Sequence, residues 1–302
     1  MLDKKNAEEA LQALDKLTPT RPDVSFMEEI DPSRLQHTGG FEIHFNSATG
    51  AIDHLRQEES GRLWADKRHP MGQFLYETFS RADYDRHYKN YIINKTENEF
   101  WAIHDFTKTY MPDWVKHLEI KPVLKKCFKS RDDVNTRFVL VLENSGEAVE
   151  LYGCPREAWI EYAIPHMGGR IDAAVQWFGK PATRIAEAVW FSFVPRVSQP
   201  HLWRMDKLGQ SVSPLEVIRN GNRKLHAVGL GVSYAGEDGW LALHTLDTAL
   251  VAPGERCLVN FNNRQPKLAK GMHFLLYNNT WCTNFPMWYE DDARFRFEIL
   301  FG

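Results

Sequence analysis

From residue 41 onward, apolar and polar residues alternate in short runs, which is the pattern of half-buried β-strands. Residues 41–45 show this alternation, and after the turn at 46–50 a second apolar run follows at 51–55. The pattern predicts further strands at 74–79, 137–142, 148–152, 159–164, 188–194, 226–234, 240–246, 273–277 and 295–300. Because few amphipathic helices separate these runs, we expect a mainly β protein, a large antiparallel β-sandwich.

Two segments depart from this pattern. In residues 6–17, Ala and Leu recur at spacings of three and four, which predicts a short helix. Residues 18–34 contain three prolines and read as a connector. We therefore expect residues 1–35 to form an N-terminal helix and linker and residues 36–302 to form one β-sandwich domain. Residues 81–119 follow no clean period and are expected to be helical or irregular.

Composition excludes several classes of protein. The 302 residues are 43% hydrophobic, and 37 Lys and Arg against 40 Asp and Glu give a formal charge of −3, which argues against disorder and against nucleic acid as a partner. No apolar run approaches the roughly 20 residues of a membrane span, and the N-terminus does not resemble a secretion signal. We expect a cytoplasmic protein whose four widely spaced cysteines are reduced.

Sequence motifs give little support to metal or nucleophilic chemistry. The 12 histidines form no H-x-H, H-x-x-x-H or H-x-D pattern, and neither a nucleophile elbow nor a glycine-rich nucleotide loop is present. The sequence therefore predicts no metal site and no cofactor. Carboxylate chemistry is harder to exclude, because a glycosidase needs two acids about 5–5.5 Å or about 6.5–9.5 Å apart. Among the acids that lie near aromatic residues, the catalytic candidates are Asp172 and Glu187.

The residues 276–295, LYNNTWCTNFPMWYEDDARF, combine aromatic rings with amides and carboxylates. Such a mixture suits a sugar, because a pyranose ring can lie on an aromatic face while amide and carboxylate groups bind its hydroxyls. The alternative is an ordered loop whose rings fill the core and whose asparagines satisfy turning backbone. A second block of similar character spans residues 176–184. The predicted carbohydrate contacts are Trp177, Asn278, Asn279, Trp281, Asn284, Trp288 and Asp292.

Both blocks carry a family resemblance. The strings IDAAVQWFGKPATRIAEAVWFSFVP and LYNNTWCTNFPMWYEDDARFRFE resemble the C-terminal region of proteins related to glycoside hydrolase family 38, the α-mannosidase superfamily, and in particular a microbial and fungal branch of it. The resemblance covers residues 40–302. It implies a β-sandwich of the galactose-mutarotase and mannosidase C-terminal type, without the upstream domain that carries the zinc ligands and the catalytic aspartate in that family. No catalytic residue is carried over.

Three functional interpretations follow. The first is a glycan-binding or accessory module, whose partners would be a carbohydrate or glycoside-like molecule and a separate or missing catalytic domain. The second is a stand-alone glycosidase, lyase or biosynthetic enzyme that uses a carboxylate or histidine pair in a cleft between the sheets. The third is an inactive product of gene truncation. The aromatic and amide block, together with the absent H-x-D motif, favours the first.

Overall fold

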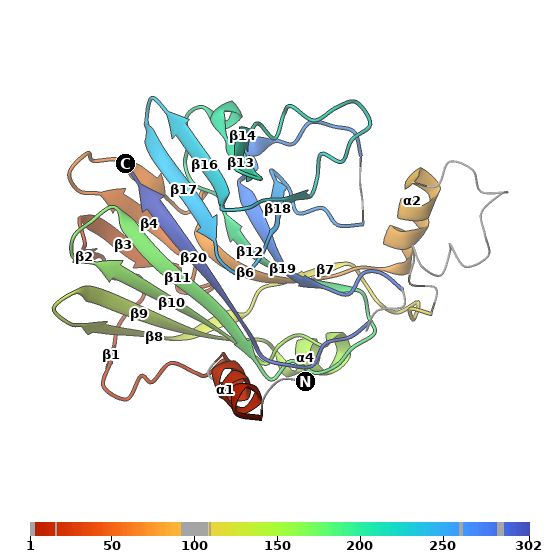
Figure 1. The fold of residues 1–302 in the computed structure, drawn as a ribbon, viewed down its shortest axis with the longest axis horizontal. Helices are drawn as coiled ribbons and strands as arrows, with labels where there is room; N and C mark the ends of the chain where they lie inside the picture. The colour runs from red at the N-terminus through yellow and green to blue at the C-terminus, as the bar shows by residue number, and fades with distance from the viewer. Residues whose placement is uncertain (1–3, 16, 92–107, 109, 260–261, 283–286) are drawn as a thin grey trace.

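Two antiparallel sheets, stacked face to face, form the body of the protein in the computed structural model, which describes residues 4–15, 17–91, 108, 110–259, 262–282 and 287–302 (Figure 1). Within the described residues, sheet A contains, in spatial order, β1 (Glu28–Glu29), β8 (Val123–Arg131), β9 (Asn135–Glu143), β10 (Glu157–Pro165), β11 (Arg170–Phe178), β20 (Ala293–Phe301), β17 (Gly239–Thr245), β16 (Gly231–Gly236), β13 (Arg204–Lys207) and β14 (Gln210–Val212). Sheet B contains β15 (His226–Ala227), β18 (Leu250–Pro253), β19 (Met272–Asn278), β12 (Glu187–Phe193), β6 (Met71–Thr78), β4 (Ile52–Gln57), β3 (Phe41–Phe45) and β2 (Gln36–Thr38), with β5 (Leu63–Ala65) on β4 and β7 (Leu118–Ile120) on β6.

Aromatic side chains fill the space between the two sheets. Phe45 of β3 contacts Phe138 of β9 with ring centroids 5.3 Å apart, and Phe191 of β12 lies 5.3 Å from Phe297 of β20. Side chains alternate between the faces of a strand, so the residues of β3 are alternately buried and half-buried. Burial of each such ring stabilises the fold by about 1.5–3 kcal/mol. The predicted mainly β sandwich is confirmed.

One predicted strand is a helix. Residues 148–152 lie in α4 (Gly146–Tyr152) rather than in the sheet. Ser145 caps its N-terminus by accepting a hydrogen bond from the Ala148 amide, and Gly153 ends it in the left-handed conformation at φ +76°. A Cβ at Gly153 would meet the Thr183 side chain at 2.5 Å, so the position also needs glycine for close packing. The two caps favour a helix more strongly than the apolar alternation favours a strand, because the alternation covers only five residues.

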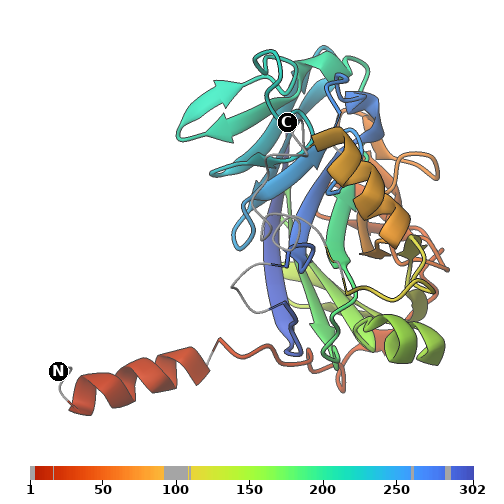
Figure 2. The same cartoon turned by 90° about the vertical axis from the view of Figure 1, so that its right-hand side faces the viewer.

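The N-terminal helix forms as predicted but lies away from the body. No residue of α1 (Lys4–Asp15) is buried, and the helix projects from the sandwich (Figure 2). The connector that follows does contact the domain. Its Val24 and Met27 pack on the outer face of sheet A, and β1 pairs with β8 at the edge of that sheet. The segment expected to be a linker therefore contributes both a strand and an apolar contact to the sandwich.

The remaining helices are short. α2 (Arg81–Tyr91) begins at a capping box, in which the Asp83 carboxylate accepts from the Ser80 amide at 2.7 Å. It occupies the start of the segment 81–119, of which residues 92–107 and 109 lie outside the described part. The single turns η1 (Pro200–Leu202) and η2 (Leu268–Lys270) connect strands. Within the described chain, no helix has both the length and the apolar character needed to cross a membrane.

The residue His117 joins α2 to sheet B. Its Nε2 lies 3.1 Å from a carboxylate oxygen of Glu77 in β6, and its Nδ1 lies 3.1 Å from Asp83 at the start of α2. Hydrogen bonds to Asp83 and then to Glu77 raise the pKa of His117 from 6.5 to about 10. The imidazolium therefore holds two buried carboxylates, one from each element.

Replacement of His117 by glutamine should destabilise the protein most below pH 6.5. There the ring is protonated in both the folded and the unfolded state, so its pairing contributes in full. Between pH 6.5 and about 10 only the folded state keeps the proton, and the contribution declines as the pH rises. Urea unfolding at pH 6, 8 and 10 measures this difference, with the exposed His201→Gln as control. A difference independent of pH would contradict the assigned pairing.

Candidate functional site

The two blocks singled out in the sequence meet at one end of the sandwich. The Trp177 indole donates to the Asp291 carbonyl at 3.1 Å, and the Gly179 amide donates to the Asp292 carboxylate at 2.9 Å. On the neighbouring sheet, the amide of Asn279 donates to the carbonyl of Glu187 at 3.2 Å. The loop after β11 and the loop after β19 therefore lie side by side and are joined through hydrogen bonds.

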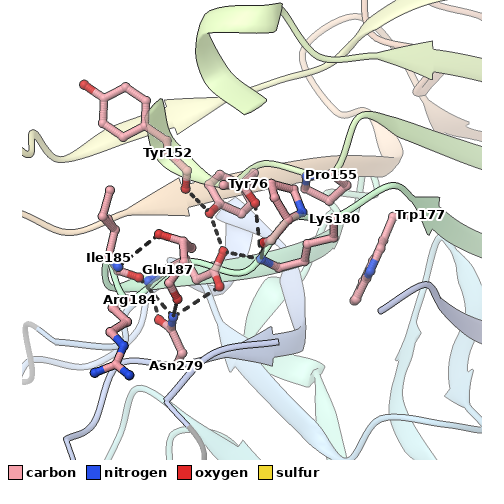
Figure 3. A network of polar contacts seen from close by, with 12 residues as sticks. Tyr76, Tyr152, Pro155, Trp177, Lys180, Arg184, Ile185, Glu187 and Asn279 are labelled. Carbon is pink, nitrogen blue, oxygen red and sulfur yellow. Dashed lines mark hydrogen bonds and ion pairs between the residues drawn. The ribbon is translucent and has the colours of Figure 1, made fainter. Parts of the chain in front are cut away.

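A fully buried ion pair lies beneath these loops. Lys180 Nζ is 2.9 Å from Glu187 Oε2, and neither side chain is exposed (Figure 3). Lys180 follows β11 in the chain, and Glu187 is the first residue of β12. The ammonium also donates to the carbonyls of Gly153 at 3.2 Å and Pro181 at 3.3 Å, so all three of its protons are used. The lysine thus connects sheet A, sheet B and the end of α4.

The Tyr76 hydroxyl adds a proton to this cluster. It lies 2.6 Å from the Tyr152 carbonyl and also contacts the Glu187 carboxyl group. A phenol has one proton to donate, and the carbonyl can only accept. The Tyr76 proton is therefore shared between the Tyr152 carbonyl and Glu187 Oε2, the oxygen that also faces the Lys180 ammonium. These donors favour the ionised form of Glu187.

Burial has the opposite effect on the acid. Loss of solvent raises the pKa of Glu187 from 4.5 to about 7, although Lys180 opposes the rise. A carboxyl group that titrates near neutral pH has the property of a general acid or base. Glu187 is completely buried, however, and a substrate has no path to it in this conformation. The arrangement supports a structural role for the cluster.

The side chain of Asn279 clamps the loops above the ion pair. Its Oδ1 accepts from the Glu187 amide at 2.8 Å. Its Nδ2 has backbone carbonyls within reach on both loops, those of Thr183 at 3.1 Å, Ile185 at 3.0 Å and Met287 at 3.2 Å. Because the side chain is nearly buried, these bonds form without competition from water. Asn279 therefore fixes the backbone on either side of the surface described next.

An exposed ring stands on these fixed loops. The Trp288 side chain is 41% exposed, and the Arg184 guanidinium carbon lies 4.8 Å from its ring centroid. The contact is a cation–π interaction between the two loops. Arg184 sits one residue after Thr183, and Trp288 sits one residue after Met287, so both follow directly on carbonyls that Asn279 holds. We call Arg184 and Trp288 the Trp288 surface.

The structure separates the other predicted carbohydrate contacts. Trp177 is 1% exposed and lies in the core, so its ring offers no face to a sugar. Asn278 closes a turn, since its Oδ1 accepts from the amide and hydroxyl of Thr280. Trp281 is half-buried, with its ring 5.5 Å from that of His87. Asp292 is half-buried and caps the Gly179 amide, and Asn284 lies outside the described residues.

The two catalytic candidates do not face one another. Asp172 lies on β11 of sheet A, where it lines a surface hollow of about 250 Å³ and pairs with Arg170 at 2.5 Å. The same arginine reaches Glu298 at 2.9 Å. Glu187 lies on sheet B inside the buried cluster. The two acids therefore do not form the facing pair that glycoside hydrolysis requires.

Three residues of this site were not identified from the sequence as functional. Lys180 and Arg184 lie inside the second aromatic block, and Tyr76 lies in a predicted strand. One sequence signal could have indicated Lys180: it is a lone lysine between the aromatic end of a strand and a proline. If such a lysine is buried, its charge requires a partner. Nothing in the sequence links Tyr76 to Glu187, which lies 111 positions away.

One group of side chains in the described part of the chain has the spacing of a metal site. Ligand atoms of His37, Glu42 and Glu58 lie within 4.8 Å of one another. Both oxygens of Glu42 accept from Arg56, and His37 Nδ1 lies 2.7 Å from Glu58. These groups therefore satisfy one another without an ion.

Comparisons with known proteins bear on both family and fold. The family model described as a domain of unknown function, DUF5054, matches residues 1–172. No curated protein matches the sequence. An α-mannosidase from Enterococcus faecalis V583 is similar in structure, with a TM-score of 0.54 and 8% identity, over 90% of this chain and 30% of that one. A glycosyl hydrolase family 38 protein from Enterococcus faecalis gives a TM-score of 0.52, 8% identity and the same coverage.

The similarity to the α-mannosidase concerns only part of that larger protein. The chain spans about 30% of the length of the mannosidase it matches, and at 8% identity the likeness extends to the fold alone. A galactose mutarotase-like protein from Clostridium acetobutylicum matches over 91% of this chain and 98% of its own, with a TM-score of 0.48 and 11% identity. The predicted resemblance to the β-sandwich region of family 38 proteins is confirmed.

Proposed function

Because the chain belongs to the DUF5054 family, we propose a function from its own site: the protein is a carbohydrate-binding or accessory module that recognises a sugar on the Trp288 surface. The fold it shares with part of an α-mannosidase agrees with a carbohydrate-related role. The observation that carries the proposal is the exposed Trp288 ring, which stands on two loops fixed by the buried Asn279 side chain.

The chemistry of the Trp288 surface suits a sugar. One face of the indole contacts Arg184, and the remaining exposed area is a flat apolar surface on which the C–H face of a pyranose can stack. The Arg184 guanidinium holds the indole from its other face. Because the loops are already held, little conformational entropy is lost when a ligand binds. Affinity gained in this way does not require a deep pocket.

Substitution of Trp288 by alanine should weaken binding of a glycan at least tenfold, because it removes the stacking face. A printed glycan array that includes α-mannosides identifies the ligand, and calorimetry with that ligand measures the dissociation constant. Trp240, which is 38% exposed on β17 of sheet A, provides the matched control. Trp240→Ala should leave the affinity unchanged. The proposal is wrong if the wild-type protein binds no glycan, or if Trp288→Ala binds as tightly as wild type.

A further inference from the structure

A small polar cavity lies on the other side of sheet B. Phe191 points toward sheet A, where it contacts Phe297, so the preceding residue Trp190 points the opposite way. Glu77 shares that outer face, and its carboxylate accepts from the Trp190 indole at 2.7 Å. The cavity beside Glu77 has a volume of about 110 Å³. Its charged lining residues come from separate segments of the chain: Glu77, Asp83, His117, Lys224, Glu255 and Arg256.

Each acid in this lining already has a cationic partner. Glu77 and Asp83 share the ring of His117 at 3.1 Å each. Asp83 also pairs with Arg86 at 2.5 Å. Glu255 accepts from Lys270 at 2.6 Å. The negative charges of the cavity are therefore neutralised by groups of the protein itself.

The cations of the lining are less well satisfied. Lys224 is 4% exposed, and no hydrogen bond or ion pair joins its Nζ to any residue that the structure describes. Arg256 donates to Glu119 at 2.6 Å through one terminal nitrogen, while its Nε is buried without an acceptor among the residues that the structure describes. Lys224 is near enough to Glu255 to contribute to the lowered pKa of that carboxyl, but no hydrogen bond joins the two side chains among the described residues. The cavity therefore has positive groups in excess of the acceptors available to them.

We propose that this cavity binds a small oxyanion group, a carboxylate or a phosphate, through Lys224, with Arg256 and the imidazolium of His117 supplying further positive charge. The volume of about 110 Å³ admits such a group. It is too small for a whole sugar or a drug-sized molecule, whose pockets measure about 300–1,000 Å³. The rest of the ligand must remain outside. The site does not depend on the Trp288 surface, so either proposal can fail without the other.

The anion supplies what the lining lacks. Its oxygens accept a charge-assisted hydrogen bond from Lys224 Nζ, which no residue of the described chain accepts. An uncharged ligand offers weaker acceptors. The site should therefore distinguish glucuronate from glucose and inorganic phosphate from chloride at the same ionic strength.

The experiment measures binding of three probes to the full chain: inorganic phosphate, glucuronate and glucose. Calorimetry and thermal unfolding at constant ionic strength should show binding and stabilisation by phosphate or glucuronate, or by both, but not by glucose. The pattern among the two anions identifies the preferred chemistry. If neither anion binds to the wild-type protein at millimolar concentration, the proposal is overturned without recourse to a variant.

Replacement of Lys224 by methionine should weaken the affinity for the anion at least tenfold. The variant should be about as stable as the wild type when no anion is present, because the Lys224 ammonium makes no hydrogen bond with the described residues and methionine keeps the apolar stem. The same substitution at Lys125, which is exposed on β8 of sheet A, is the matched control and should bind as the wild type does. Equal anion affinity in Lys224→Met and wild type would assign the binding elsewhere and overturn the proposal.

Discussion

Replacement of Lys180 by methionine is expected to destabilise the protein increasingly as the pH rises above 7. Below pH 7 the loss should be about 1–3 kcal/mol, because the carbonyls of Gly153 and Pro181 lose their donor. Above pH 7 it should grow by about 1.4 kcal/mol for each pH unit. Urea unfolding of the variant and the wild type from pH 5.5 to 9 measures the difference.

The sign follows from the proton on Glu187. Burial raises the pKa of this acid from 4.5 to about 7, so in the wild type the folded state holds a proton that the unfolded state has lost between these values. Stability falls as the pH rises through that window and is then independent of this group. Without the ammonium of Lys180 the folded acid cannot ionise at pH 7. The free energy of unfolding therefore continues to fall with rising pH in the variant after it has become constant in the wild type.

The double variant Lys180→Met with Glu187→Gln is the control for this effect. It keeps the shape of the pair but has no group that titrates, so its destabilisation relative to the wild type should not grow between pH 7 and 9. If the single variant is destabilised by the same amount at every pH from 5.5 to 9, Glu187 does not titrate near neutral pH.

The fold could be predicted from the sequence because the alternation of apolar and polar residues shows which face of a strand is buried. The run 41–45 has this pattern and forms β3. The same rule failed at 148–152, where alternation over five residues was compatible with a short helix. Ser145 and Gly153 at its ends carried the deciding information, since each satisfies backbone groups that a helix leaves unpaired. Short apolar runs are therefore better assigned by their flanking caps than by their period.

The candidate site was accessible only in part. The two aromatic blocks were identified, and the structure brings them together. Composition alone did not distinguish Trp177, which fills the core, from Trp288, which is exposed, because both are tryptophans among polar neighbours. Asn279 likewise faces inward while Asn278 closes a turn. Burial of a single side chain depends on which distant strand covers it, and neither propensity nor spacing contains that information.

The buried cluster and the Trp288 surface are parts of one arrangement. Glu187 forms an ion pair with Lys180, and its backbone amide donates to the Asn279 side chain. The Asn279 amide group also contacts the backbone carbonyls that directly precede Arg184 and Trp288. A cluster inaccessible to substrate can in this way determine the geometry of an exposed surface. Its contribution should be measurable as binding as well as stability.

Substitution of Asn279 by leucine is accordingly expected to have two effects. The side chain keeps its approximate volume but loses its acceptor and both donors, which leaves the Glu187 amide and up to two carbonyls unpaired. At about 1–3 kcal/mol for each unsatisfied group, the free energy of unfolding should fall by about 3 kcal/mol or more. Backbone amides near Trp288 should also exchange hydrogen faster, and glycan affinity should fall at a temperature where the variant remains folded.

The neighbouring Asn278 offers the matched control. Its side chain accepts only from Thr280 within the described residues, so Asn278→Leu should cost about 1 kcal/mol or less and leave both exchange and glycan affinity near the wild-type values. If Asn279→Leu were destabilised yet bound the glycan normally, Asn279 would serve folding without positioning the Trp288 surface. Parallel losses of hydrogen-exchange protection and of affinity, confined to the Asn279 variant, distinguish a positioning residue from one that only fills the interior.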